Sequence, residues 1–334
     1  MVAFPFSWSE VTAEESQRLK ASFPDGLVND LVRYSTGILM PRAYTAIAED
    51  IYNFQLRDDD VWVVSYPKSG TTWTQEMTWM IINDMDKQSS QNIPNGVRSP
   101  FIETLCLTNL DYLQANNRLP DDEVLKKIIE DPLGYMNTMQ GRRLIKSHLP
   151  MEFLPPKIIE KCKILYVGRN PNDTLVSYYH FSRNIPEYGF TGSFEEYVDL
   201  FEKGLLAYGS HWDHIMQAWR YKDHQNVKFV WFEDIKINVK SVIEEICTFL
   251  DHPLSASQIE DLSEYLEFDN MSQNKMANPT AGMKHDSTAN FMRKGEVGDW
   301  KNYLQEEMAR HSKKWMELYR TGKGTKLMEK TGGL

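Results

Sequence analysis

Four short segments with strand character define the pattern of this chain, two of them around the apolar runs 61–64 and 164–167, and segments with helical character separate them. The four segments predict strands at residues 61–66, 143–147, 163–168 and 227–232. Helices are expected between and around them, near residues 43–53, 71–84, 122–130, 172–182, 194–207, 210–222, 239–250, 256–265 and 301–319. Short strands separated by helices predict an α/β fold with a central parallel sheet and helices on both faces.

Two of these helices carry start signals. Ser193 with Glu196, and Ser255 with Gln258, have the spacing of a capping box, in which each side chain satisfies the other's backbone N–H.

The chain is predicted to form one domain over residues 1–334, because no repeat, linker or low-complexity tract interrupts it. Residues 1–40, 85–120 and 270–290 are expected to be peripheral, the second mostly irregular and the third polar and mobile. Such segments often close over a ligand, but ordinary surface loops have the same composition.

The first strand leads into a candidate phosphate-binding loop, Tyr66-Pro67-Lys68-Ser69-Gly70-Thr71-Thr72-Trp73. A helix start offers unpaired N–H groups and partial positive charge to an anion, and a glycine lets the backbone approach it. The loop resembles a P-loop but lacks the Walker spacing. The same residues also suit an ordinary strand–turn–helix connection, so the loop alone leaves both interpretations open.

Two later segments add cations to this picture. Arg169 follows the strand at 163–168, and Ser177 lies on the next helix, so both could reach one phosphate at the carboxyl end of the sheet. The polar stretch 291–300 contains Arg293 and Lys294 beside two glycines. Taken alone, that stretch would be interpreted as a solvated loop.

Composition restricts the partners. The chain has 334 residues, 37 of them basic and 47 acidic, and its net charge of −10 argues against a general nucleic-acid surface. An anionic cofactor must therefore be held by local cations, for which the candidates are Lys68, Lys146, Arg169, Arg293 and Lys294.

The cysteines and the N-terminus indicate a cytoplasmic protein. Cys106, Cys162 and Cys247 are widely spaced, so no disulfide framework and no metal site are expected. The first residues lack the features of a signal peptide, and no apolar run approaches the length of a membrane helix, so no membrane contact is expected.

Four motifs together resemble the cytosolic sulfotransferases, and insect members in particular. They are Pro67–Trp73, Lys146-Ser147-His148-Leu149-Pro150, Arg169–Ser177 and Arg293–Trp300, in the order that this family shows. The resemblance implies transfer of a sulfuryl group from PAPS (3′-phosphoadenosine 5′-phosphosulfate) to an acceptor hydroxyl, without a metal (EC 2.8.2 class).

The resemblance also implies roles for individual residues. His148 would remove the acceptor's proton, and a pKa near 6.5 suits an imidazole to that task at neutral pH. Lys68 would oppose charge on the leaving group, Lys146 would support the transferring group, and Ser177 would bind phosphate and hold Lys68 until the acceptor arrives. The nucleotide would be bound by Lys68, Ser69, Gly70, Thr71, Thr72, Trp73, Arg169, Ser177, Phe232, Phe268, Phe291, Met292, Arg293, Lys294 and Gly295.

The acceptor site is expected to include Phe101, Lys146, His148 and Phe181, although both aromatics would also suit an ordinary core. An aromatic pocket suits a phenol, a sterol or a retinoid alcohol. An insect relative that dehydrates retinol with the same cofactor makes elimination after sulfation an alternative outcome.

The chain departs from the family at three places. Phe232 stands where many relatives have Tyr, and Leu266 stands where Thr is usual. The vertebrate dimer motif keeps Lys301, but Gln305, Glu306 and Arg310 replace its Thr, Val and Glu. A monomer, or a dimer of another type, is therefore expected.

Two other classes of function remain open. A phosphotransferase of the P-loop class is disfavoured by the missing Walker spacing and by the lack of an obvious Mg²⁺ carboxylate. A nucleotide-binding module without catalysis is disfavoured by the intact Lys68, Lys146 and His148.

Overall fold

A four-stranded parallel sheet forms the centre of the molecule. The computed structural model describes residues 2–24, 26–108, 122–185, 188–278 and 291–304, together with Gln114 and Pro120. The strands β4 (Val61–Ser65), β5 (Leu144–Ser147), β6 (Lys163–Gly168) and β7 (Val227–Trp231) lie in the order β5-β4-β6-β7, all parallel. The α/β fold and its four predicted strands are confirmed.

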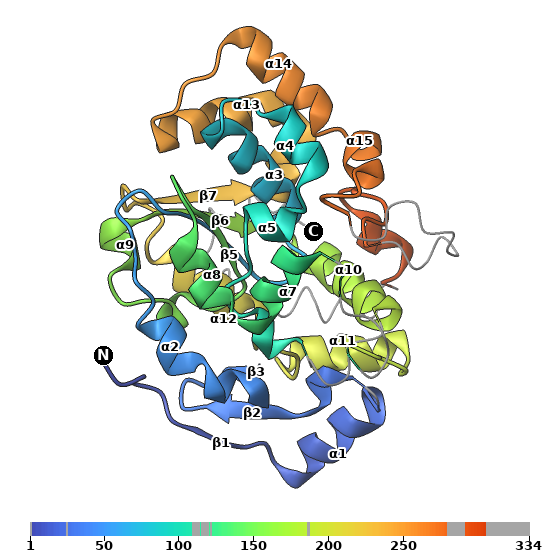
Figure 1. Ribbon diagram of the computed structural model, residues 1–334. Coiled ribbons are helices and arrows are strands. Elements are labelled where there is room, and N and C mark those ends of the chain that lie inside the picture. The colour runs from blue at the N-terminus through green and yellow to red at the C-terminus, as the bar shows by residue number, and fades with distance from the viewer. Residues whose placement is uncertain are drawn as a thin grey trace.

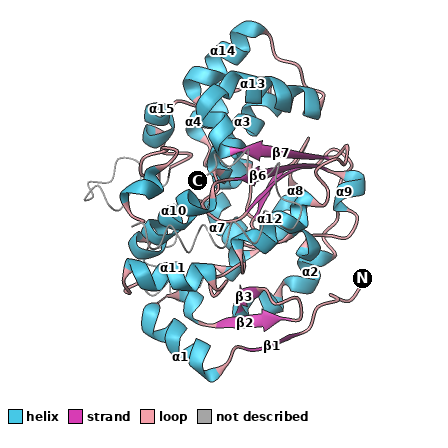
Figure 2. Cartoon of the chain, turned by 180° about the vertical axis from the view of Figure 1, so that it is seen from behind, coloured by secondary structure: helices cyan, strands magenta, loops and turns pink. Residues whose placement is uncertain are grey.

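Each face of the sheet packs against its own hydrophobic core, because successive side chains of a strand point to opposite faces. Trp62 and Val64 of β4 belong to one cluster, whereas Val61 and Val63 belong to the other. On the second face, that of Val61 and Val63, lie α3 (Thr71–Ile82), α13 (Phe232–Leu250) and α14 (Ala256–Tyr265). The first face is covered by α2 (Ala48–Tyr52), α8 (Pro132–Thr138), α10 (Pro171–Asn184), α11 (Phe194–Glu202) and α12 (His211–Trp219) (Figures 1 and 2).

A second, antiparallel sheet lies beyond the first core and was not predicted. Its strands β1 (Trp8–Glu10), β2 (Leu31–Tyr34) and β3 (Leu39–Pro41) pack with α1 (Ala13–Ser22) at the end of the molecule opposite α14 (Figure 1). Val32 and Leu39 are fully buried in the first core. The strands are only three or four residues long, which leaves little pattern to recognise in the sequence.

The segment after α3 also differs from the expectation of irregular chain. It contains α4 (Lys87–Asn92), α5 (Asn95–Arg98) and a 3₁₀ turn at Thr104–Cys106. The remaining described helices are α7 (Glu123–Glu130), α9 (Ile158–Lys161), α15 (Phe268–Gln273) and the 3₁₀ turns Leu27–Asn29, Arg42–Ala46, Met151–Phe153 and Asp299–Asn302. Residues 305–319 of the predicted final helix lie outside the described residues.

The helix starts were predicted with mixed success. The capping box of Ser255 and Gln258 is confirmed. Ser193 accepts the N–H of Glu196 at 3.2 Å, but the Glu196 carboxylate instead accepts the Ser22 hydroxyl at 2.7 Å. The prediction of a reciprocal box at Ser193 was therefore wrong, because a distant partner competes for the carboxylate.

None of the helices in the described ranges is long and apolar enough to cross a membrane.

A buried ion pair fixes the strand starts opposite the site. The Asp60 carboxylate accepts two hydrogen bonds from Arg143, at 2.6 and 2.5 Å, and both side chains are fully buried. The Arg143 carbonyl accepts the N–H of Val61, and the Asp60 carbonyl accepts that of Lys163. The pair therefore sets the register where β5, β4 and β6 begin.

We expect Asp60→Asn to lower the free energy of unfolding by about 3–5 kcal/mol, because it leaves a buried guanidinium without its counter-charge. Urea denaturation measures this loss. Asp58→Asn is the control, since Asp58 makes an exposed pair with Lys161 and its loss should hardly move the midpoint. Equal effects of the two variants would show that the Asp60 pair does not fix the strands.

Candidate functional site

The phosphate-binding loop connects β4 to α3 in a strained conformation. Gly70 precedes α3 with φ 102°, and Lys68 has φ 66°, which is unusual for a residue with a side chain. A Cβ at Gly70 would lie 2.7 Å from the Phe232 ring. The buried Ser69 hydroxyl has no hydrogen-bond partner among the described residues. An anion bound at the start of α3 would satisfy this hydroxyl and the helix N–H groups.

A cavity of about 340 Å³ opens at the carboxyl ends of the strands. The predicted site residues line it with the one exception of Ser69, which is fully buried within the loop. The lining that was predicted consists of Lys68, Gly70, Thr71, Thr72, Trp73, Phe101, Lys146, His148, Arg169, Ser177, Phe181, Phe232, Phe268, Phe291, Met292, Arg293, Lys294 and Gly295. The nucleotide and acceptor residues expected from the sequence thus face one space.

Lys68 is held by aromatic rings. Its ammonium lies 4.4 Å from the ring centre of Phe181 and 4.3 Å from that of Phe291, and 3.5 Å from the Phe291 carbonyl oxygen. Burial, and after it the nearby cations Arg169, Lys146 and Arg293, together lower the pKa of Lys68 to about 7. An anion in the cavity would reverse both effects.

Two more cations face the cavity from the neighbouring strands. The Arg169 guanidinium donates to the Lys68 carbonyl at 3.0 Å and stacks 4.3 Å from the Phe232 ring centre, while its Nε has no partner among the described residues. Burial lowers the pKa of Lys146 to about 8, although the charge of nearby Glu103 acts to raise it. The Lys146 ammonium lies 4.2 Å from the ring centre of Phe101.

His148 follows β5 and is fixed in one tautomer. Its Nδ1 lies 2.8 Å from the Ser65 carbonyl oxygen, which can only accept, so Nδ1 carries the proton and Nε2 keeps a free lone pair. Burial, followed by the charge of Lys146, lowers the pKa of His148 well below its usual value. The ring is therefore neutral at physiological pH and can accept a proton at Nε2.

The backbone of His148 is held from two sides. Its N–H donates to the buried Glu103 carboxylate, which also accepts the Ser147 hydroxyl at 3.0 Å. Its carbonyl accepts the Nε2–H of His214 at 2.9 Å. Burial raises the pKa of Glu103 to about 7, although these hydrogen bonds oppose the rise.

The late loop is anchored to the helix that carries Ser177. The Asp173 carboxylate in the first turn of α10 accepts the N–H of Gly298 at 2.7 Å and that of Trp300 at 3.0 Å. Asp299 pairs with both Arg293 and Lys294, and these bonds overcome the effect of burial and lower the pKa of Asp299 to about 2. The loop thus presents its cations to the cavity from a fixed base.

Aromatic side chains form the remaining walls. Trp73 and Phe268 are nearly parallel, with ring centres 6.0 Å apart and planes at 17°. The Trp73 Nε1–H donates to the Leu266 carbonyl at 2.8 Å. Gly295, with φ 65°, lies so close to Phe268 that a Cβ would be 2.4 Å from its ring.

Several lining residues were missed by the sequence analysis: Thr104, Leu107, Ile185, Tyr188 and Glu296. Ile185 follows Phe181 by one helical turn, so helical spacing could have identified it. Thr104 and Leu107 lie in a segment expected to be irregular. Glu103 and Asp173 act from beneath the surface of the cavity, and no local pattern distinguishes them from exposed acids.

Comparison with known proteins assigns the chain to a family. A family model described as a sulfotransferase domain matches residues 58–332. The chain belongs to the sulfotransferase family. Its relatives include luciferin sulfotransferase of Photinus pyralis, 34% identical over 282 residues, which cover 81% of this chain and 74% of the relative. Sulfotransferase 1E1 of Mus musculus is 32% identical over 289 residues, which cover 84% of this chain and 91% of the relative.

A solved structure also resembles this sulfotransferase over nearly its full length. Retinol dehydratase in complex with retinol and PAP has a TM-score of 0.85 and 28% sequence identity, with 95% of this chain and 97% of that chain covered. Within the described ranges of the sulfotransferase, no group of three or more His, Cys, Asp or Glu side chains could hold a metal ion.

We expect ¹⁵N-labelled histidine spectra to show His148 protonated at Nδ1 and unprotonated at Nε2, unchanged from about pH 6 to about pH 9. The reason is its lowered pKa and the hydrogen bond to Ser65. Loss of the signal in His148→Ala assigns it. A proton on Nε2, or a titration near neutrality, would contradict the geometry.

Proposed function

We propose that this sulfotransferase moves the sulfuryl group of PAPS to the hydroxyl of a small apolar acceptor, with His148 as the general base. The observation that carries the proposal is the placement of His148 and Lys68 in one cavity, between buried cations and an apolar wall. Transfer of this kind needs two partners held in line and charge stabilised on the departing phosphate.

The nucleotide side of the cavity suits a doubly phosphorylated ligand. The proposal assigns one phosphate to the start of α3, near Ser69, and the other to Arg169, Ser177 and the Arg293–Gly295 loop. The Ser69 hydroxyl and Arg169 Nε support this assignment, since both are buried without a hydrogen-bond partner in the part of the chain that the structure describes, and a phosphate oxygen would supply one. Trp73, Phe232 and Phe268 supply flat surfaces for a base.

The residues near the acceptor have complementary tasks. His148 takes the hydroxyl proton at Nε2, while its Nδ1–H remains bonded to Ser65. Lys68 places an ammonium where charge develops on the leaving group, and Lys146 supports the transferring group. Lys68 lies against Phe181 and Phe291, and we propose that with the nucleotide bound Ser177 holds it until the acceptor arrives.

The acceptor wall favours an apolar alcohol or phenol. Its members are largely apolar: Phe101, Thr104, Leu107, Phe181, Ile185 and Tyr188. The resembling solved structures hold retinol or androsterone together with PAP, and a curated relative is named for luciferin. We therefore propose a phenol, sterol or retinoid-type alcohol as the acceptor.

A dehydratase is the alternative function. The retinol dehydratase structures have TM-scores of 0.85 and 0.86, whereas mouse SULT7A1 in complex with PAP has 0.64. In that case the sulfate ester would lose its sulfate and a neighbouring proton to give an alkene. The released product distinguishes the two functions: a sulfotransferase releases the sulfate ester, whereas a dehydratase releases the alkene.

The domain boundaries, cellular location and oligomeric state remain proposals. We propose one domain over residues 1–334, a cytoplasmic protein, and a monomer or a dimer that does not use the vertebrate motif. Gln305, Glu306 and Arg310 of that motif lie outside the described residues.

The experiment that tests the function is a screen of phenols, sterols and retinols with labelled PAPS, with and without a chelator. Label should move to an acceptor, and the chelator should leave the rate unchanged. Transfer from ATP instead, or dependence on Mg²⁺, would support a phosphotransferase; binding of PAP without turnover would support a non-catalytic module.

His148→Ala should reduce turnover by roughly 10²–10⁴, the usual contribution of a general base, with little change in PAP affinity. Stopped assays with the best acceptor and calorimetry with PAP measure the two quantities. Lys68→Ala should weaken both, because Lys68 faces the phosphosulfate site. Near-normal turnover of His148→Ala across the neutral range would mean that another group removes the proton.

Binding of PAP should be accompanied by proton uptake at about pH 8. Lys68, with a pKa of about 7, is mostly neutral there and regains its proton beside an anion, so affinity should fall as the pH rises. Calorimetry in buffers of different ionisation enthalpy counts the protons. Lys68→Met should show clearly less uptake, with the remainder from Lys146; identical uptake in both proteins would contradict this assignment.

A further inference from the structure

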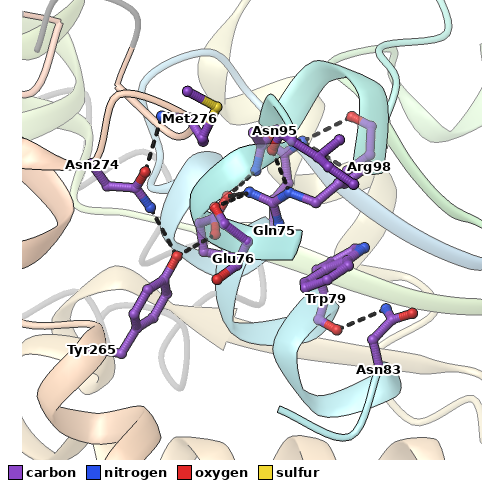
Figure 3. A network of polar contacts seen from close by, with 12 residues as sticks. Gln75, Glu76, Trp79, Asn83, Asn95, Arg98, Tyr265, Asn274 and Met276 are labelled. Atoms are coloured by element: carbon purple, nitrogen blue, oxygen red, sulfur yellow. Dashed lines mark hydrogen bonds and ion pairs between the residues drawn. The ribbon is translucent and has the colours of Figure 1, made fainter. Parts of the chain in front are cut away.

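A closed ring of hydrogen bonds lies beside the cavity without lining it. It consists of Glu76, Asn95, Met276, Asn274 and Tyr265, and Figure 3 shows the Asn95 and Tyr265 side chains pointing toward Glu76, with Asn274 beyond Tyr265. The Glu76 carboxylate accepts the Asn95 side-chain amide at 2.6 Å and the Tyr265 hydroxyl at 2.9 Å. We call this set the Glu76 ring.

The other half of the Glu76 ring closes through the backbone. The Asn274 amide donates to the Tyr265 hydroxyl at 2.8 Å, and its carbonyl oxygen accepts the Met276 N–H at 2.9 Å. The Met276 carbonyl accepts the N–H of Asn95 at 2.7 Å. Three segments distant in sequence are thereby joined: α3, the α5 region and residues 265–276.

One of these segments continues directly into the acceptor wall. Gln75 of α3 donates to the Asn95 and Ser99 side chains, both at 2.9 Å. Residues 95–99 are therefore bound to α3. One residue after Ser99 the chain pairs with β5, where the N–H of Lys146 donates to the Pro100 carbonyl at 2.9 Å. Residues 95–107 therefore run as a strap from the Glu76 ring to Phe101, Thr104 and Leu107.

A second segment continues into the nucleotide wall. Residue 265 is followed by Leu266, whose carbonyl binds the Trp73 indole, and by Phe268, which stacks on the same ring. Glu76 itself lies on α3, the helix that starts at the phosphate-binding loop. The Glu76 ring thus touches neither ligand site but joins the walls of both.

The Glu76 ring is centred on a buried charge, the Glu76 carboxylate. Glu76 is 0% exposed and its partner Arg98 only 2%, with 2.6 Å between their nearest atoms. Arg98 also stacks 4.6 Å from the ring centre of Trp79 on α3. A buried ion pair adds little net stability over apolar packing, and its best-attested use is to fix one arrangement of the segments that it joins.

We propose that the Glu76 ring couples the two halves of the cavity: nucleotide binding at Trp73 and Phe268 rigidifies residues 95–107 and so preorganises the acceptor wall. The inference rests on the proposed function only in that PAP occupies the cavity. Glu76 and Tyr265 act as positioning residues, since neither lines the cavity.

Tyr265→Phe tests the coupling, because it removes one hydroxyl and opens the ring without a large change of shape. Glu76→Gln is less suitable, since it would leave Arg98 buried without its counter-charge and endanger folding. Hydrogen–deuterium exchange, with and without saturating PAP, follows residues 95–99, which do not line the cavity.

In the wild type, PAP should slow exchange of residues 95–99 by about tenfold or more. In Tyr265→Phe this protection should fall below about threefold, while protection of residues 69–72 persists. Tyr135→Phe is the matched control: its hydroxyl donates to the Val97 carbonyl at 3.1 Å in the same strap but is not in the ring, so the protection should survive.

Two results would overturn the proposal: no protection of residues 95–99 by PAP in the wild type, or full protection in Tyr265→Phe. Loss of protection in Tyr135→Phe as well would show that the strap is merely loosened and would also count against the ring. If PAP fails to protect even residues 69–72 of the phosphate-binding loop, the assigned nucleotide is wrong. That result would contradict the proposed function rather than the coupling through the Glu76 ring.

Discussion

Positive charges that are buried together in one cavity are unfavourable, because they lose hydration and repel one another, and the site is built around this cost. Lys68, Lys146, Arg169 and Arg293 converge from four segments; burial is the main cause of the lowered pKa of both lysines, and for Lys68 the neighbouring cations add to it. Carboxylates compensate only part of this charge, mainly at Asp299 and Glu103. An anionic ligand would compensate the positive charge that the carboxylates leave, so that the contacts that bind the ligand also balance the charge of the cavity.

The fold meets this constraint by keeping the cations on rigid supports. Parallel strands deliver Lys68, Lys146 and Arg169 to one edge, and the two buried cores hold those strands from both faces. Buried acids then hold backbone rather than ligand: Glu103 binds the N–H of His148, and Asp173 binds the loop that presents Arg293. The −10 net charge of the chain therefore coexists with a cationic cavity.

Sequence alone predicted the parts whose signals are local. Two of the central strands, β4 and β6, have continuous apolar runs, and the cations and aromatics of the cavity lie in short motifs. The parts that it missed depend on distant partners. Glu196 leaves its expected box because Ser22 is available, and Glu76 is buried because Arg98, 22 positions away, reaches it. The segment after α3 is polar and rich in turn residues, yet it packs as helices and a strap because α3 and β5 bind it from either side.

We propose that the cation cluster binds a nucleotide with a phosphate on both sides of the ribose. Thermal unfolding in the presence of PAP, ADP or AMP at equal concentration tests this proposal. We expect a much larger rise in melting temperature with PAP, and loss of that advantage in Arg169→Ala, which should remove about 1.5–3 kcal/mol of PAP binding. Equal shifts with PAP and ADP would contradict it.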